Sequence, residues 1–360
     1  MKIAMFSESY APSLNGPALA VGALYRELEA MGEEVHVFPA GRGEVEERVY
    51  RSTQLPVSQG YGPSVPYFKE SARLAQMDVY HTHQPFVLGL YALRKARKYG
   101  KKLIFTYHCR YGEYAKIYLP LGSILAGPID RYVGWFANRC DAVILPSAQL
   151  KDFLIGCGVK EEKVHVIPNG IPLTAREAVA REEALVAYAG RVAGEKDIGF
   201  LLRMYVRLAQ RMPEARLRII GGGPALPQVQ HLAHQLGLGV AFTGYVPHEE
   251  LLRQVARASV FVSGSMTEVH PLTLLEAMHE GAVPVARRSP GFADVITDGT
   301  DGLLVEGEEE AFARAVEGLL RDHTRLTLMR RAAQQTAARY DIARTAAQVR
   351  QLYRHTIGSA

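Results

Sequence analysis

The sequence predicts an α/β protein made of two Rossmann-like domains that face each other across a cleft. Its 360 residues are long for one core, at about 100–200 residues per domain, and sufficient for two. Short β-branched or apolar stretches alternate with amphipathic helical stretches, a pattern typical of parallel sheets covered by helices. The alternation starts again after a turn-rich segment near the middle of the chain. Each half is therefore expected to fold around its own sheet.

Six strands are expected in each half of the chain. Those of the first half are Ile3–Ser7, Val35–Phe38, Val79–Thr82, Leu103–Thr106, Ala142–Pro146 and Val164–Pro168. Those of the second half are Leu185–Gly190, Arg216–Ile220, Val240–Thr243, Val260–Ser263, Val283–Arg287 and Gly302–Val305.

The hinge between the domains is expected in Ile167–Arg176, which contains two prolines and a glycine. This gives a first domain at 1–168 and a second at 169–340. The last helix, after Tyr340, has no evident place in the second core. Residues 341–360 are therefore expected to pack back on the first domain.

Composition and charge exclude several classes of protein. The chain is 48% hydrophobic and 22% charged, as globular proteins are, and no apolar run reaches the roughly 18 residues that span a bilayer. The first residues show no secretory signal, which predicts a cytoplasmic location. Three widely spaced cysteines predict reduced thiols, with neither disulfides nor zinc. A net charge of +5 is too small and dispersed to indicate a nucleic-acid partner.

The positive charge is concentrated in the first half, where residues 1–168 carry 20 Lys and Arg against 16 Asp and Glu. Its densest part is an acid-free run that begins with Arg94, Lys95, Arg97 and Lys98. Two interpretations stay open. The run is either a solvated helix face or a surface that binds anionic lipid.

The loops after the strands indicate a ligand with a diphosphate. The first strand is not followed by Gly-x-Gly-x-x-Gly, which argues against a dinucleotide oxidoreductase. Gly16 opens a long helix, where a backbone amide and the helix dipole can hold phosphate, although a simple turn has the same pattern. Arg191 and Lys196 follow the strand at Leu185–Gly190, where they either form surface ion pairs or neutralise a diphosphate.

Two glutamates mark the other side of this expected site. Glu268 lies in a loop after a strand, and Glu276 lies in the first turns of the next helix. Both acids could serve only the helix dipole. Alternatively, Glu268 accepts hydrogen bonds from sugar hydroxyls and Glu276 from ribose hydroxyls, while the amides of Leu272 and Thr273 meet the phosphates.

These motifs make the second half resemble the nucleotide-sugar domain of retaining glycosyltransferase family four, which has the two-Rossmann GT-B fold. The segments that carry the resemblance are Tyr188–Val192, Glu195–Lys196, Gly221–Pro224, Phe242–Val246 and the glutamates Glu268 and Glu276. The resemblance assigns Arg191 and Lys196 to the diphosphate, the Val246 main chain to the base, Glu268 to the sugar and Glu276 to the ribose. Pro271 stands where the family usually has glycine, and it lacks an amide that would face the sugar.

The first half resembles the branch of diacylglycerol glucosyltransferases and related glycolipid synthases. Its landmarks are Phe6–Pro12, Asn15–Gly16, Asp78–His83 and Thr106–Tyr114, with Pro17 and Cys109 in place of the branch's more common Val and Thr. His108 corresponds to a family histidine that contacts the donor sugar. His81 and His83 alternate along a strand, which favours structural or cleft-lining roles over metal binding.

The resemblance implies transfer of a hexose, with retention of configuration, from a nucleotide sugar to diacylglycerol or glycosyl-diacylglycerol. A UDP-sugar is the favoured donor, the reaction is a front-side displacement, and no cofactor or metal is assigned. Alternatives are a family member with a soluble or polysaccharide acceptor, a nucleotide-sugar epimerase or hydrolase of the same fold, and a non-catalytic binding protein. The sequence does not indicate an oligomeric state.

The acceptor side is expected in the segment Tyr111–Trp135, which interleaves aromatic and aliphatic residues with two cations. Such a segment forms either a buried helix pair or a surface that lies on an anionic bilayer. In the second case Tyr114, Tyr118 and Trp135 join the basic run in binding the membrane. The protein would then associate peripherally with the inner face of the cell membrane.

Overall fold

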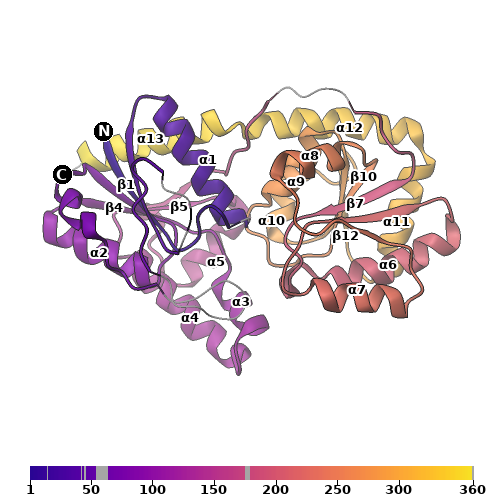
Figure 1. The fold of residues 1–360 in the computed structure, drawn as a ribbon, viewed down its shortest axis with the longest axis horizontal. Coiled ribbons are helices and arrows are strands. Elements are labelled where there is room, and N and C mark those ends of the chain that lie inside the picture. The colour runs from indigo at the N-terminus through magenta and orange to yellow at the C-terminus, as the bar shows by residue number, and fades with distance from the viewer. Residues whose placement is uncertain (14, 42, 44–45, 54–63, 175–178, 359–360) are drawn as a thin grey trace. The chain divides into compact units, whose positions relative to one another are not determined.

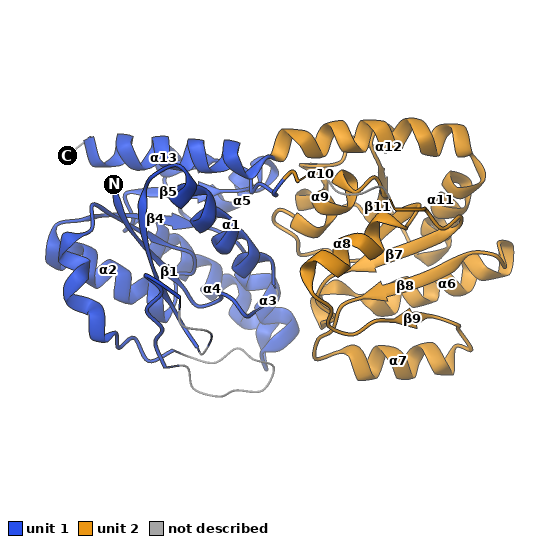
Figure 2. Ribbon diagram, turned by 45° about the horizontal axis from the view of Figure 1, so that its top comes forward, with its two compact units in different colours: residues 1–172, 341–360 blue, residues 173–340 orange. Residues whose placement is uncertain are grey.

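The computed structural model describes residues 1–360 except 14, 42, 44–45, 54–63, 175–178 and 359–360 (Figure 1). The chain forms two compact units, coloured separately in Figure 2. Unit 1 contains residues 1–172 and 341–360, and unit 2 contains residues 173–340.

Unit 1 is built on a parallel six-stranded sheet in the order β2-β1-β3-β4-β5-β6. Its strands are β1 (Lys2–Ser7), β2 (Glu34–Pro39), β3 (Val79–Thr82), β4 (Lys102–Thr106), β5 (Ala142–Leu145) and β6 (Val164–Val166). The last strand ends two residues before the expected limit at Pro168, which has no amide to donate to a neighbouring strand.

Helices cover both faces of this sheet. They are α1 (Gly16–Ala30), α2 (Val87–Tyr99), α3 (Tyr111–Tyr118), α4 (Gly122–Ala137), α5 (Lys151–Gly156) and α13 (Ile342–Gly358), with short 3-10 turns at Lys69–Gln76, Ala148–Leu150 and Glu161–Lys163. α1 and α13 lie side by side on one face of the sheet (Figure 1). Their apolar residues form one core with those of β1 and its neighbours. Right-handed crossovers place α2 on the opposite face.

Unit 1 extends to residue 172, beyond the expected boundary at 168, because the start of α13 holds the intervening residues. The amide of Ile342 donates to the carbonyl of Ile171 at 3.0 Å. A side chain on Gly170 would clash with the backbone of Ile342 at 2.5 Å. The last two residues of the expected hinge, 175 and 176, lie outside the described residues.

Unit 2 repeats the architecture with a parallel six-stranded sheet in the order β12-β11-β10-β7-β8-β9. Its strands are β7 (Leu185–Ala189), β8 (Arg216–Ile220), β9 (Ala241–Phe242), β10 (Val260–Ser263), β11 (Val283–Arg287) and β12 (Leu303–Val305). The two parallel sheets confirm the predicted fold class.

The helices of unit 2 also lie on both faces of the sheet. They are α6 (Ile198–Arg211), α7 (Leu226–Gln235), α8 (His248–Ala256), α9 (Leu272–His279), α10 (Pro290–Ala293), α11 (Glu309–Arg321) and α12 (His323–Ala337), with 3-10 turns at Gly194–Lys196 and Ala338–Tyr340. The rings of Phe200 and Phe312 meet edge to face, which joins α6 to α11. Because crossovers are right-handed, α6 and α7 lie on one face, and α8 and α9 on the other.

A buried hydrogen-bonded chain fastens α13 to the sheet of unit 1. His81, which is fully buried on β3, contacts the Tyr353 hydroxyl through Nδ1 and the Thr106 hydroxyl through Nε2, each at 2.6 Å. Both ring nitrogens are thereby satisfied, which gives His81 a structural role.

We expect Tyr353→Phe to lower the free energy of unfolding by about 1–3 kcal/mol, because it leaves Nδ1 of a buried histidine without a partner. Urea denaturation of the full chain measures the change. Tyr67→Phe, at a ring that is 70% exposed, serves as the control and is expected to have little effect. Equal stability of the Tyr353 variant and the wild type would contradict this account of how α13 is held.

Candidate functional site

The candidate donor site lies where the strand order of unit 2 reverses. The chain enters the sheet at β7, winds outward to β9, and returns to the other side of β7 with β10. Adjacent loops after β7 and β10 therefore diverge to opposite faces, and ligands of open α/β sheets bind at such a point. The residues that follow these two strands include Arg191, Lys196 and Glu268.

The turn that carries Lys196 is fixed by its successor, Asp197. This residue takes a left-handed conformation, with φ of 44°, and its side chain caps α6 by accepting from the amide of Phe200. Arg287, at the end of β11, binds the same carboxylate at 3.0 Å and lies over the Phe200 ring. The loop between β7 and α6 is thus held at its α6 end, directly after Lys196.

Lys196 and Glu268 meet across the reversal point. The Lys196 ammonium lies 2.6 Å from Oε1 of Glu268, and both side chains are about four-fifths buried. A charge-assisted hydrogen bond of this length is strong. Each charge is therefore compensated by the other.

Close backbone packing fixes the loop that carries Glu268. A side chain on Gly291, in α10, would approach the carbonyl oxygen of Glu268 to 2.3 Å. The loop leads to Pro271 and then to Leu272 and Thr273, the first residues of α9. These two amides have no acceptor within the helix and lie at the positive end of its dipole.

Arg191 lies in the same loop as Lys196, and Val246 belongs to a further loop at the same edge of the sheet. Arg191 follows β7, and its carbonyl accepts a hydrogen bond from the Tyr188 hydroxyl at 2.8 Å. Val246 lies between β9 and α8, next to Tyr245, whose exposed ring lies against Gly222.

The glycine-rich turn at Gly221–Pro224 is explained by packing. A side chain on Gly221 would come within 2.1 Å of the Gly190 carbonyl, and one on Gly223 within 2.2 Å of the Val192 carbonyl. Both glycines also have positive φ. The turn therefore supports the loop that carries Arg191.

In unit 1, Gly16 is the first residue of α1, as predicted. The side chain of Asn15 caps the helix by accepting from the amide of Ala18 at 2.9 Å. A side chain on Gly16 would meet no atom within 4 Å, so the backbone there is open to a ligand. Pro17 removes one of the amides that a helix start normally offers.

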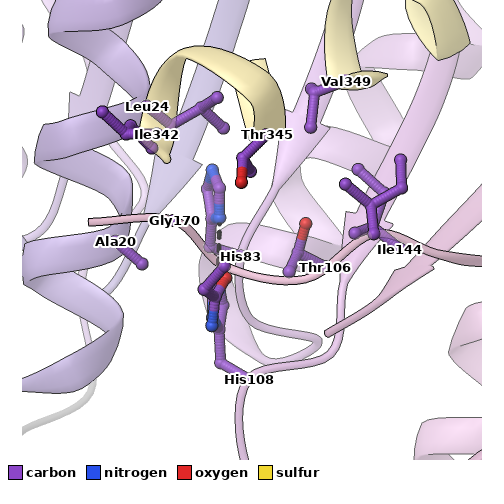
Figure 3. Close-up of a pocket in the computed structure, with 12 residues that line it drawn as sticks. Ala20, Leu24, His83, Thr106, His108, Ile144, Gly170, Ile342, Thr345 and Val349 are labelled. Atoms are coloured by element: carbon purple, nitrogen blue, oxygen red, sulfur yellow. Dashed lines mark hydrogen bonds between the residues drawn. The ribbon is translucent and has the colours of Figure 1, made fainter. Parts of the chain in front are cut away.

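His108 is held by a second histidine that the sequence analysis left without a defined role. Nε2 of His108 lies 2.9 Å from Nδ1 of His83, and Figure 3 shows the two rings joined in a small cavity that Thr345 of α13 also lines. Burial lowers the pKa of His108 to about 4 and that of His83 well below its usual value. Both rings are thus neutral near pH 7, and an N–H of one donates a hydrogen bond to the other.

The sequence motifs do not predict two contacts that histidines make with site residues. His83 follows β3 and His108 follows β4, so their meeting depends on a register that aligns Thr82 with Phe105. His248 contacts Glu276 at 3.0 Å from the start of α8, and its motif gives no sign of this. The useful signal is the His-x-His spacing at 81 and 83, which places both rings on the same face of the strand, where their centroids lie 4.1 Å apart.

The predicted acceptor segment forms α3 and α4, which pack against each other but leave many apolar side chains uncovered. Leu121 is 73% exposed and Ile124 is 70% exposed, and four more are partly exposed: Ile117, Leu119, Leu125 and Trp135. Tyr114 and Tyr118 are half-buried, with ring centroids 6.1 Å apart. Arg139 lies over the Trp135 ring at 3.9 Å.

The basic run forms the second half of α2. Arg94, Arg97 and Lys98 are exposed, while Lys95 is half-buried with its ammonium 5.2 Å from the centre of the Tyr91 ring. Within the described residues, no helix is long and apolar enough to span a membrane, and no group of His, Cys, Asp or Glu side chains is arranged to bind a metal ion.

Two open, parallel α/β sheets, one of them with charged loops at its reversal point, are typical of Rossmann-like nucleotide-binding proteins. Two family models match this chain: Glycosyltransferase Family 4 over residues 14–175, and Glycosyl transferases group 1 over residues 173–338. Together they span almost the whole chain, which belongs to glycosyltransferase family 4. It is a retaining, nucleotide-sugar-dependent glycosyltransferase of the GT-B fold.

Curated relatives agree with this placement, and solved structures agree with the fold. The chain is 29% identical to the alpha-monoglucosyldiacylglycerol synthase of Streptococcus pneumoniae over 89% of this chain and 78% of that protein. It is 27% identical to the enzyme of the same name from Acholeplasma laidlawii over 86% of each chain. Anabaena HepE, solved with UDP and glucose, superposes with a TM-score of 0.79 at 18% identity, over 98% of this chain and 99% of that chain.

His270, in unit 2, is expected to make the stability of the fold depend on pH. It is buried, both of its ring nitrogens lack a hydrogen-bond partner among the described residues, and burial lowers its pKa to about 4 from an ordinary 6.5. Between pH 4 and pH 6.5, this histidine is protonated in the unfolded chain but not in the folded chain. Stability is therefore lost as pH falls below about 6.5.

We expect His270→Phe to remove about 1 kcal/mol of the stability loss between pH 7.5 and 5.5, because phenylalanine has no proton to bind. Urea denaturation of both proteins at the two pH values measures the difference. An identical loss in the variant and the wild type would show that His270 does not contribute.

Proposed function

We propose that this enzyme transfers a hexose from a UDP-sugar to a membrane lipid, diacylglycerol or glycosyl-diacylglycerol, at an anionic membrane surface. The main evidence for a lipid acceptor is the exposed apolar surface of α3 and α4. Relatives named as alpha-monoglucosyldiacylglycerol synthases support it, and the UDP complexes of Anabaena HepE support the choice of donor.

The donor binds unit 2 through the residues after β7 and β10. Lys196 and Arg191 neutralise the diphosphate, and the amides of Leu272 and Thr273 add to the positive potential around it. The pair seen between Lys196 and Glu268 supports this assignment, because it brings a phosphate-binding cation and a sugar-binding acid within 2.6 Å. Glu268 accepts from sugar hydroxyls, Glu276 from the ribose and the Val246 main chain contacts the base.

The chemistry is a front-side displacement. The bond between the anomeric carbon and the β-phosphate oxygen breaks, and the acceptor oxygen attacks from the same face as its proton passes to the departing phosphate. Negative charge grows on that phosphate, so Arg191 and Lys196, together with the Gly16 amide, stabilise the transition state. His108, neutral and held by His83, donates or accepts a hydrogen bond at the sugar.

The acceptor reaches unit 1 from the membrane. Soluble proteins seldom expose several large apolar side chains on one helical pair, and such surfaces often mark contacts with membranes or other proteins. Trp135, Tyr114 and Tyr118 are ring types suited to the headgroup region. The exposed cations of α2 add attraction to anionic lipid. The protein thereby associates with the inner face of the cell membrane without crossing it.

We expect Arg191→Ala and Lys196→Ala each to lower turnover by raising the activation free energy of sugar transfer by about 2–4 kcal/mol. Each change leaves the growing negative charge on the phosphate uncompensated. Glu276→Ala should instead weaken donor binding. Turnover of a radiolabelled UDP-hexose measures the first effect and calorimetry with UDP the second. Arg207→Ala, on an exposed face of α6, is the matched control. Near wild-type turnover in both folded cation variants would refute the donor site.

We expect the full chain to bind vesicles that contain anionic lipid in a salt-sensitive way and neutral vesicles weakly. Replacing Arg94, Lys95, Arg97 and Lys98 by Ser should reduce binding to anionic vesicles, at about 1 kcal/mol per cation, and reduce lipid glycosylation. Leu121→Ser with Ile124→Ser should reduce binding even at high salt, because it removes apolar contact. Sedimentation with vesicles measures both effects.

The matched control removes four exposed arginines of unit 2, namely Arg207, Arg253, Arg314 and Arg325. This variant should bind vesicles as the wild type does, and none of the variants should change affinity for UDP. If the wild type did not bind vesicles, the lipid acceptor would be rejected in favour of a soluble one.

A further inference from the structure

Glu276 has an unusual environment for a carboxylate. Its side chain is 9% exposed, and its two oxygens differ in their contacts. Oε1 lies 3.0 Å from Nε2 of His248, whereas Oε2 is buried without a hydrogen-bond partner among the described residues. A buried acceptor left unpaired costs free energy, and in native proteins it often marks a place that a ligand completes.

His248 fixes the orientation of this carboxylate. A carboxylate only accepts, so Nε2 of His248 carries the proton in the contact. His248 is the first residue of α8 and directly follows the loop that contains Val246, while Glu276 lies on α9. The contact therefore ties the loop expected to meet the base to the acid expected to meet the ribose.

We propose that His248 is a positioning residue, which holds Oε1 of Glu276 so that Oε2 is presented to a ribose hydroxyl of the donor. The inference rests on the proposed donor site in unit 2. It makes the site selective for ribonucleotides, because a sugar without hydroxyl groups leaves the buried Oε2 unpaired. Rejection of a ligand that lacks an expected hydroxyl is the strongest form of polar selectivity.

Contacts that do not involve His248 hold α8 in place. His248 is 38% exposed. The neighbouring acids Glu249 and Glu250 pair with Arg253 within the helix, and Leu252, Val255 and Ala256 bury its apolar face. Variants at His248 are thus expected to fold and to report on ligand binding.

The test compares ribonucleotides with their 2′,3′-dideoxy counterparts by calorimetry on the full chain. UDP, ADP and GDP are titrated first, and the tightest is taken forward with its dideoxy form. We expect His248→Ala to weaken the ribonucleotide about tenfold, as for loss of a hydrogen bond to a charged group, and to leave the dideoxy form unchanged. His248→Gln, whose side-chain amide can reach Oε1, should recover most of the affinity.

His234→Ala, at an exposed histidine of α7, is the matched control. Equal weakening of both nucleotides by His248→Ala, or no rescue by glutamine, would overturn the positioning role. Unchanged ribonucleotide affinity in His248→Ala would overturn it as well. Failure of the wild type to bind any of the three nucleotides would instead reject the donor site, and this inference with it.

Discussion

Right-handed crossovers between parallel strands determine where this enzyme can bind a ligand. Each sheet is entered near its middle, at β1 or β7, and is then extended first to one side and later to the other. Only one point in each sheet then sends neighbouring loops to opposite faces. Lys196 and Glu268, 72 positions apart in sequence, meet at that point in unit 2. The strand order therefore determines where the candidate donor site lies, and the side chains determine what it can bind.

The alternation of apolar strands with amphipathic helices was enough to predict both sheets, because a buried parallel strand is continuously apolar. It also located Lys196 and Glu268 in loops after strands. The partners of these residues could not be predicted in this way. The contact between His83 and His108 follows from the alignment of β3 with β4, and that between His248 and Glu276 from the packing of α8 on α9. Neither distance is encoded in local periodicity.

The same limit applies to the segment that forms α3 and α4. Helical spacing of apolar residues shows that a face exists, but not what covers it. The structure shows that the two helices cover each other only in part, which leaves Leu121 and Ile124 largely exposed. Nor does spacing along the chain show that Lys196 and Glu268, on loops after different strands, form an ion pair.

The return of α13 to unit 1 affects the order in which the protein can be made. Ala346, Val349, Leu352 and Tyr353 belong to the same apolar core as β1 and α1, although more than 300 residues separate them from β1 in sequence. On the ribosome, unit 1 therefore emerges first but lacks one wall of its core. Unit 2, which is continuous in sequence, has all of its residues before unit 1 does. The core of unit 1 is therefore completed only when α13 packs beside α1, after unit 2 has been made.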